Sequence, residues 1–365
     1  MFEDFVLGYN QGWFSTCYGS DLSTGWSEAT AVYAAMRYLD GKVEPCAEGM
    51  PVDSGIDGFF AMARGCGARV VRLWAFESYS KEGCDYGSRE SLDGIKGLTP
   101  AFEHHVHQVM QAAMRYGVQV YWTALVGNWP RHWRSPEIKD IGRWRRIHYN
   151  ILHNRYNAQQ AYHEHALGPF VKLLSAYENN VYALDLMNEV QGSLRDFWGS
   201  DWNRVRRWIK HGREFVRGVM PSLKVTASCG HHTAVTDVLE GRVSDLGLDF
   251  YDLHLYNDEG RIPQMQALGR LALADATPLL LGEFGQRDGS YNDEVQTRVV
   301  REFIQKAYDH GFLGALAWRL DDYRPGESLD ASRHTYVYPH TEEGERIYYA
   351  RPAVRVIQAG ISRVA

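Results

Sequence analysis

Two apolar stretches, VYALDLMNE at residues 181–189 and PLLLGEFG at residues 278–285, decide how the rest of the chain is interpreted. Each has the length and composition of a buried strand. The first ends on Asn188 and Glu189, and the second carries Glu283 near its end. A carboxylate at the exit of a buried strand is costly unless another group pairs with it or uses it. Two carboxylates in this position predict a site that works through paired carboxyl groups.

The remainder of the chain supplies six further apolar runs with strand character, at residues 5–10, 68–76, 118–126, 224–229, 248–256 and 314–320. Helical patterns fall between most of them, at 56–64, 100–116, 160–177, 202–219, 263–275 and 293–310, and a closing helix begins at Pro352. Alternating strands and helices predict parallel pairing, and eight such units make a closed barrel. We therefore expect an α/β fold, a single (β/α)8 TIM barrel that forms one domain over residues 1–365.

The connections between these elements differ in length at the two ends of the predicted barrel. Those that lead into strands are short, as at 65–67, 116–117, 178–180 and 310–311. Those that leave the first, second, third and eighth strands are long, at 11–54, 77–99, 127–159 and from the eighth strand to about 351. Within these long loops we expect one short helix, at 27–39. Extra length on the carboxyl face of the strands places the active site there.

Bulk composition narrows the function classes. The 365 residues are 45% hydrophobic and 23% charged, which is ordinary for a soluble globular protein. A formal net charge of −6 argues against a general nucleic-acid binder, because phosphate binding needs a basic surface. No apolar run approaches the length of about 18 residues that a membrane span needs. The first residues resemble no signal peptide, so we expect an intracellular protein or a secreted one whose signal was removed. The oligomeric state is left open.

Side-chain alternation along two strands suggests partners for the glutamates. Residues two apart in a strand point to the same side, so Arg72 shares a side with Trp74, and His254 shares one with Tyr256. An inward Arg72 near Glu283 would lower the pKa of that carboxyl by its charge. The hydroxyl of Tyr256 is placed to donate to the same group. A glutamate without such a cation keeps a raised pKa, which suits a general acid.

These residues, in this order along the chain, resemble glycoside hydrolase clan A, and within it family five, the cellulase and β-mannanase group. The residues that carry the resemblance are Arg72, Asn188, Glu189, His254, Tyr256, Glu283 and Trp318. The resemblance implies a retaining glycosidase in which Glu189 is the acid/base and Glu283 the nucleophile. It also implies that Asn188 binds the sugar 2-hydroxyl and that Trp318 lies under the sugar ring. His254 and Tyr256 would line the same subsite.

Further stretches are similar to the β-mannanase branch of that family. Residues 71–76, VRLWAF, resemble its strand-two pattern and include Trp74. Residues 125–129, LVGNW, resemble its pattern after strand three and add Asn128 and Trp129 to the expected substrate-binding residues. This sequence departs from the family patterns in two places that bear on which polysaccharide is the substrate. Val190 and Gln191 follow the acid/base where mannanases usually have Pro, and the third strand lacks the His that many cellulases carry.

Other interpretations of the same residues stay open. Asn188 could instead cap the next helix, with Glu189 paired to Arg195. A β-glucanase, a transglycosylase and an inactive carbohydrate-binding protein fit the same barrel. An Arg-rich stretch at 131–155 would suit an acidic polysaccharide. Histidine groups at 104–107 and 163–165 fall in helical patterns rather than at strand ends. We therefore expect a carbohydrate as the partner, and neither a metal nor a cofactor.

Overall fold

Eight parallel strands form the centre of the molecule. The computed structural model describes residues 5–12, 35–38, 43–45, 55–76, 84–86, 95–126, 141–194, 200–256, 264–286, 292–320, 335–342 and 345–360. The barrel strands are β1 (Val6–Gln11), β4 (Val70–Trp74), β7 (Gln119–Val126), β8 (Val181–Asn188), β9 (Val225–Thr226), β10 (Tyr251–Tyr256), β11 (Leu279–Gly285) and β12 (Gly314–Ala317). All eight runs predicted as strands are confirmed.

The order of these strands nearly closes a ring. It runs β10-β11-β12-β1-β4-β7-β8-β9, and each hydrogen-bonded pair is parallel. A single parallel bridge between Cys229 and Leu253 joins the end of β9 to β10. The (β/α)8 barrel expected from the strand count is therefore confirmed.

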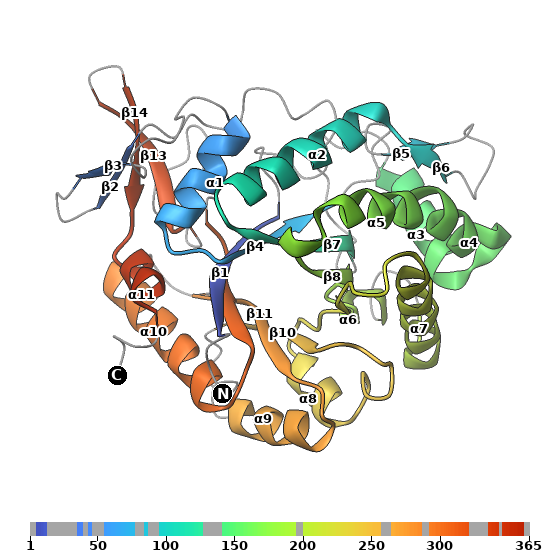
Figure 1. Ribbon diagram of the computed structural model, residues 1–365. Coiled ribbons are helices and arrows are strands. Elements are labelled where there is room, and N and C mark those ends of the chain that lie inside the picture. Colours follow the sequence, from blue (N-terminus) through green and yellow to red (C-terminus); the bar gives the residue numbers. More distant parts are fainter. Residues whose placement is uncertain are drawn as a thin grey trace.

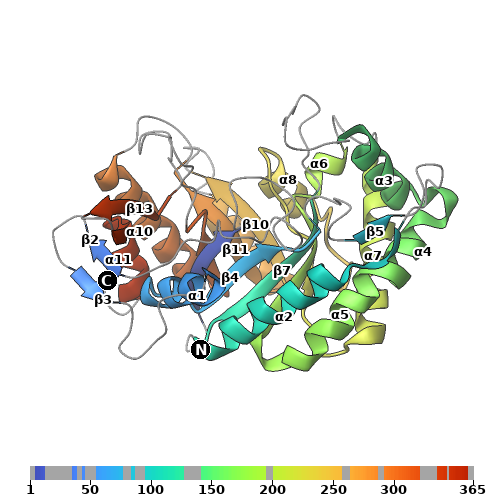
Figure 2. The same cartoon turned by 90° about the horizontal axis from the view of Figure 1, so that it is seen from above.

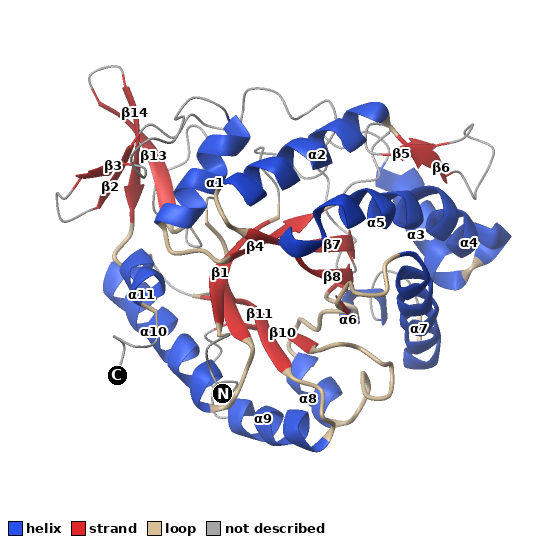
Figure 3. Ribbon diagram, viewed as in Figure 1, coloured by secondary structure: helices blue, strands red, loops and turns tan. Residues whose placement is uncertain are grey.

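Helices surround the barrel, as Figures 1 and 3 show. They are α1 (Gly55–Gly65), α2 (Pro100–Arg115), α3 (Ile141–His153), α4 (Ala158–Tyr162), α5 (Gly168–Leu174), α6 (Gln191–Leu194), α7 (Trp202–Val219), α8 (Ala234–Leu239), α9 (Met265–Ala274), α10 (Asp293–Asp309) and α11 (Ala353–Ala359). Side-chain caps fix several starts: Thr99 accepts from the backbone N–H of Phe102, and Asp201 from that of Arg204. Among the described helices, none has both the length and the apolar character to cross a membrane.

The core has two parts. The larger lies between the strands and the surrounding helices. The smaller fills the barrel interior and takes residues from the region of six strands: Val70, Tyr121, Tyr182, Ala183, Phe250, Leu280 and Leu316. These inward residues alternate with outward ones such as Val71, which belongs to the larger cluster. Above the smaller cluster, the guanidinium of Arg72 lies 5.4 Å from the ring centre of Tyr121. The interior therefore changes from apolar to charged along the barrel axis.

Long insertions follow the carboxyl ends of the strands, as predicted, but they contain more regular structure than expected. The sequence predicts a helix at 27–39, whereas residues 35–38 form strand β2 (Ala35–Tyr38) instead. The final loop contains strands β13 (Val337–Glu342) and β14 (Glu345–Ala350), and α3 lies in the third loop. Residues 160–177 divide into α4, a π-helix at His163–Leu167, α5 and a 3-10 helix at Ser175–Asn180.

A small second sheet joins the first and last of these insertions. Its order is β13-β14-β2-β3, with β3 at Val43–Pro45, and β2 pairs in parallel with β14. It lies beside α11 in Figures 1 and 2. A two-stranded sheet, β5 (Cys84–Tyr86) with β6 (Ile95–Leu98), belongs to the second insertion. At residues 35–38 the expected helix was wrong, because β2 pairs with β14 near the other end of the chain, and local patterns give no sign of that partner. The other residues of 27–39 lie outside the described part of the chain.

Two glycine variants should test the close packing of the barrel. A side-chain carbon at Gly8 would lie 1.8 Å from the backbone oxygen of Val70 on the neighbouring strand. Gly8→Ala should therefore lower the free energy of unfolding by about 3 kcal/mol or more, measured by urea denaturation. Gly218, in helix α7, has no atom within 4 Å of such a carbon. Gly218→Ala should leave stability unchanged or raise it by up to about 1 kcal/mol. Equal effects of the two variants would contradict the observed strand spacing.

Candidate active site

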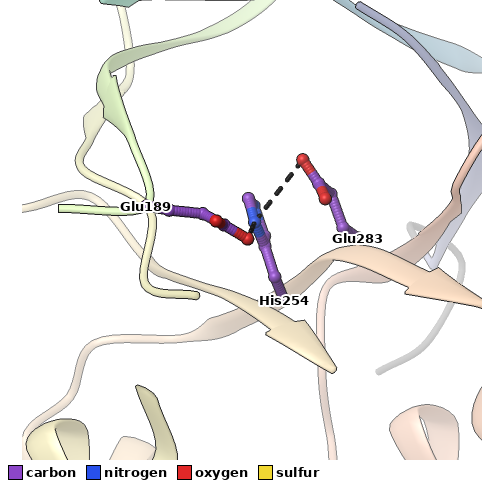
Figure 4. Close-up of side chains that lie close together, drawn as sticks. All are labelled: Glu189, His254 and Glu283. Carbon is purple, nitrogen blue, oxygen red and sulfur yellow. Dashed lines mark hydrogen bonds and ion pairs between the residues drawn. The ribbon is translucent and has the colours of Figure 1, made fainter. Parts of the chain in front are cut away.

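The two glutamates meet at the carboxyl end of the barrel. Glu189 directly follows β8, and Glu283 lies on β11. Their side chains point toward each other with the imidazole of His254, from β10, between them (Figure 4). One carboxylate oxygen of each glutamate and one ring nitrogen of His254 all lie within 4.8 Å of one another. Glu283 is 3% exposed and Glu189 is 9% exposed. The structure thus brings together the pair that the sequence singled out.

Glu283 has the partners that strand alternation predicted. Nη1 of Arg72 donates to its Oε1 at 2.6 Å, and the hydroxyl of Tyr256 donates to its Oε2 at 2.9 Å. Nδ1 of His254 lies 3.4 Å from Oε1. Both carboxylate oxygens are therefore engaged by groups that fix the orientation of the side chain.

Glu189 lies between two imidazoles. Nδ1 of His254 is 3.1 Å from its Oε1, and Nε2 of His231 is 3.4 Å from its Oε2. Its backbone has a φ of 52°, in the left-handed region, and its N–H donates to Oγ of Ser228 at 3.0 Å. A side-chain carbon at Gly230 would lie 2.2 Å from the carboxyl group, so the turn after β9 leaves room for it only because residue 230 is glycine. An unusual backbone turn at a buried carboxylate is typical of functional sites.

Arg72 is fully buried and connects several strands. Besides Glu283 it donates through Nη2 to Asp185 at 2.7 Å and to Oδ1 of Asn188 at 2.8 Å. Nη1 also donates to Oδ1 of Asn10 at 3.1 Å. Burial alone would lower the pKa of Arg72, but the charges of Glu283 and Asp185 raise it above its ordinary value. The guanidinium is therefore a permanent positive charge inside the barrel.

The pKa values of the two carboxyl groups are shifted in opposite directions, and each shift is the reverse of the sequence expectation. Burial raises the pKa of Glu283, and the charges of His254 and Arg72 offset this only in part. Burial also acts to raise the pKa of Glu189, but the hydrogen bond and charge of His254, with His231, bring it below its ordinary value. The expectation for Glu283 weighed the charge of Arg72 and left out burial, which raises the pKa of this carboxyl. The expectation for Glu189 left out the hydrogen bond and charge of His254.

Aromatic side chains lie on neighbouring parts of this face. The rings of Trp74 and Trp318 are 5.7 Å apart between centroids and inclined by 39°. A side-chain carbon at Gly12 would lie 3.4 Å from Trp74 and 3.5 Å from Trp318. Trp74 is buried, whereas Trp318 is half-buried. The two expected aromatic residues are thus adjacent. Asn128 and Trp129 lie outside the described residues, as does Arg195.

Several residues of the site were not among those chosen from the sequence. They are Asn10, Tyr121, Asp185, Ser228, His231 and Asp252. Asp185 accepts from Arg72 and from the Ser228 hydroxyl at 2.9 Å, and Asp252 accepts from the Tyr121 hydroxyl at 2.5 Å. An acid inside an apolar run was the visible signal for both aspartates. His231 followed a predicted strand, which placed it on the correct face without showing its contact to Glu189.

Comparison with known proteins identifies the architecture. No model of a known protein family matches the sequence, and no curated protein matches it. Solved structures do match. β-Mannanase from the blue mussel Mytilus edulis has a TM-score of 0.59 and 17% identity, covering 86% of this chain and 86% of the mussel chain.

This chain has the fold of that enzyme. Endo-1,4-β-mannanase from Eisenia fetida matches at a TM-score of 0.58 and 18% identity, over 89% of this chain and 86% of its own. A broad-specificity endoglucanase from Clostridium acetobutylicum matches at 0.58 and 13% identity, over 92% of each chain. The (β/α)8 architecture therefore agrees over most of the length with solved glycoside hydrolases.

Removing the imidazole between the glutamates should change the ionisation of Glu189. Because the hydrogen bond from His254 lowers the pKa of Glu189, His254→Phe should raise it, so that the carboxyl titrates at a higher pH than in the wild type. Titration of 13C-labelled glutamate carboxyls by NMR measures this directly. His163→Phe, at a buried histidine of the outer helix layer, is the matched control and should leave the titration unchanged. An unshifted Glu189 in His254→Phe would contradict the assignment.

Loss of the buried cation should be costly in a pH-dependent way. Arg72→Met leaves the carboxylates of Glu283 and Asp185 buried without their cation, which should lower the free energy of unfolding by about 3–5 kcal/mol at neutral pH. The deficit should shrink at low pH, where the unpaired carboxyls take up protons. Arg115→Met, which breaks a surface ion pair to Asp57, should cost less than about 1 kcal/mol. Denaturant unfolding at two pH values measures both variants.

Proposed function

We propose that the protein is a retaining glycosidase that cleaves β-glycosidic bonds, with Glu283 as nucleophile and Glu189 as acid/base. The observation that carries the proposal is the pair of buried carboxyl groups, with oxygens within 4.8 Å, at the carboxyl end of a barrel. Retaining enzymes hold their two carboxyl groups about 5–5.5 Å apart, whereas inverting enzymes leave roughly 6.5–9.5 Å for a water molecule. The close spacing supports retention.

In the first step, a carboxylate oxygen of Glu283 attacks the anomeric carbon. The bond from that carbon to the leaving oxygen breaks, and Glu189 gives its proton to the oxygen. The products are a glycosyl ester of Glu283 and the free leaving sugar. Glu189 must be protonated at this moment. A bound sugar removes water from around the carboxyl, which raises its pKa toward the range of a general acid.

In the second step, the ionised Glu189 takes a proton from water. The water oxygen attacks the anomeric carbon, and the ester bond to Glu283 breaks, which restores both carboxyl groups. Arg72 and Tyr256 hold Glu283 through its two oxygens at 2.6 and 2.9 Å. They orient the nucleophile and stabilise the carboxylate when it leaves in the second step.

For the substrate we propose a β-mannan or a mannose-containing glycan. The resemblance of residues 71–76 and 125–129 to the β-mannanase branch supports this choice. Solved structures similar to this chain include an exo-β-1,4-mannosidase from an Opitutaceae bacterium, the β-mannanase from Mytilus edulis and the endo-1,4-β-mannanase from Eisenia fetida. We assign sugar contacts to Asn188, His254, Trp74, Trp318, Asn128 and Trp129. A β-glucan is the second candidate, because an endoglucanase has the same fold.

Matched glutamine variants should test the proposal. Wild type, Glu189→Gln and Glu283→Gln are assayed against β-mannan, β-glucan, an acidic polysaccharide and aryl β-glycosides. Wild type should cleave mannan and release the β-anomer first, as seen by NMR. Each variant should lose roughly 10²–10⁴-fold in kcat. Glu302→Gln, at an exposed glutamate of α10, is the control and should keep full activity.

The same panel separates the alternatives. With an aryl glycoside that has a good leaving group, Glu189→Gln should still form the glycosyl–enzyme and accumulate it, whereas Glu283→Gln should not form it. Cleavage of only the glucan or only the acidic polysaccharide would be consistent with the proposed mechanism and would exclude mannan as the substrate. Sugar binding without any cleavage by the wild type would indicate a binding protein. Activity that survives in both glutamine variants would overturn the paired-glutamate mechanism.

A further inference from the structure

The space between the catalytic glutamates has the donor set of a metal site. Oε1 of Glu189 and Oε1 of Glu283 lie 3.1 and 3.4 Å from Nδ1 of His254. Each residue of this trio offers one ligand atom, and these atoms lie within 4.8 Å of one another. A tetrahedral zinc ion with bonds of 2.0–2.2 Å holds its ligand atoms about 3.3–3.6 Å apart. Two of the three separations are already close to this range.

A second, independent observation concerns the other ring nitrogen of His254. Its Nε2 is buried, and it has no hydrogen-bond partner among the described residues. Oδ1 of Asp252 is likewise buried and without a hydrogen-bond partner among the described residues, and it lies 3.9 Å from Nε2 of His254. Histidines that bind a metal through one nitrogen usually donate the other N–H to a carboxylate. A small approach of the ring to Asp252 would complete that arrangement and leave Nδ1 free to bind an ion.

We propose that Glu189, His254 and Glu283 bind a borderline divalent cation of the Zn²⁺ type, with Asp252 orienting the histidine. Two carboxylates and one imidazole suit zinc, whereas Mg²⁺ and Ca²⁺ prefer six or more oxygen ligands. The Tyr121 hydroxyl holds the other oxygen of Asp252 at 2.5 Å, so the carboxylate faces His254 from a fixed position. The ion would lie beside Nδ1 of His254, facing Oε1 of both glutamates, whose side chains Figure 4 draws. Oε1 of Glu283 also accepts from Nη1 of Arg72 at 2.6 Å, so the ion would share this oxygen with the guanidinium.

The cation in this position is an inhibitor, not a catalyst. It occupies the oxygens that must attack the anomeric carbon and carry the proton, so a bound ion and a reacting sugar exclude each other. This consequence rests on the proposed glycosidase function, whereas the binding site itself does not. Free Zn²⁺ should therefore raise the apparent KM without lowering kcat, and a chelator should restore the original KM.

Calorimetry tests the site without any need for activity. Protein treated with EDTA and then desalted is titrated with ZnCl₂, and in parallel with MgCl₂. We expect one Zn²⁺ per chain at this site and no binding of Mg²⁺. His254→Gln should lose this binding, and Asp252→Asn should weaken it about 10–100-fold. His163→Gln, at a buried histidine of the outer layer, should bind as wild type does.

The wild-type protein also gives a test that depends on no variant. Crystals soaked in ZnCl₂ should show an anomalous peak between the three side chains. No binding, unchanged binding in His254→Gln, or a peak elsewhere would overturn the site. A chain that binds zinc there but cleaves no β-glycan overturns the proposed function alone. Cleavage without zinc binding overturns the metal site alone.

Discussion

The site depends on one buried charge, the guanidinium of Arg72. Arginine keeps its proton inside a protein, so the surrounding strands must supply acceptors for it. They do so from β1, β8 and β11 at once, through Asn10, Asp185 and Glu283. A side chain on one strand thereby sets the spacing of three others at the carboxyl end of the barrel. The nucleophile proposed for the reaction is one of these structural acceptors, so its position is fixed before any substrate arrives.

His254 makes the two glutamates chemically different. It contacts both, but at 3.1 Å from Glu189 and 3.4 Å from Glu283, and the remaining partners of each are unlike. Glu283 has a permanent cation and a phenol, whereas Glu189 has a second imidazole that is more than one-third exposed. Charge on Glu189 therefore responds to the protonation of its neighbours and to the removal of water. A group that alternately gives and takes a proton needs this responsiveness, and a nucleophile does not.

Local sequence patterns predicted the barrel well because every strand is an apolar run of its own. The eight strands, the helices that follow most of them and the position of both glutamates depend on neighbours in the sequence. The errors concern segments whose partners are distant. β2 pairs with β14 near the far end of the chain, and no local pattern contains that information. The same limit applies to the site. Strand alternation correctly predicted that Arg72 and Tyr256 contact Glu283, whereas the contact of His231 with Glu189 depends on the geometry of a turn.

The protonation of the glutamates was the least predictable property. A pKa depends on every charge within a few ångströms, and a sequence gives residue types without distances. Arg72 was correctly placed on Glu283, yet the net direction reversed once burial and the position of His254 were included. The proposed catalytic pair is thus recognisable from the strand ends, while the pKa of each member depends on the full set of contacts.

The small sheet has a consequence for how the chain acquires its fold. The barrel closes where β1 meets β12, and β2 with β14 forms a second pairing between the same two ends of the chain. Both pairings wait for the last part of the sequence to be synthesised. Until then the edge of β1 has no partner on that side, and contacts so distant along the chain form slowly. A chain released early from the ribosome would expose this edge of β1 to strands of other molecules. In the folded protein, pairing with β12 covers the edge.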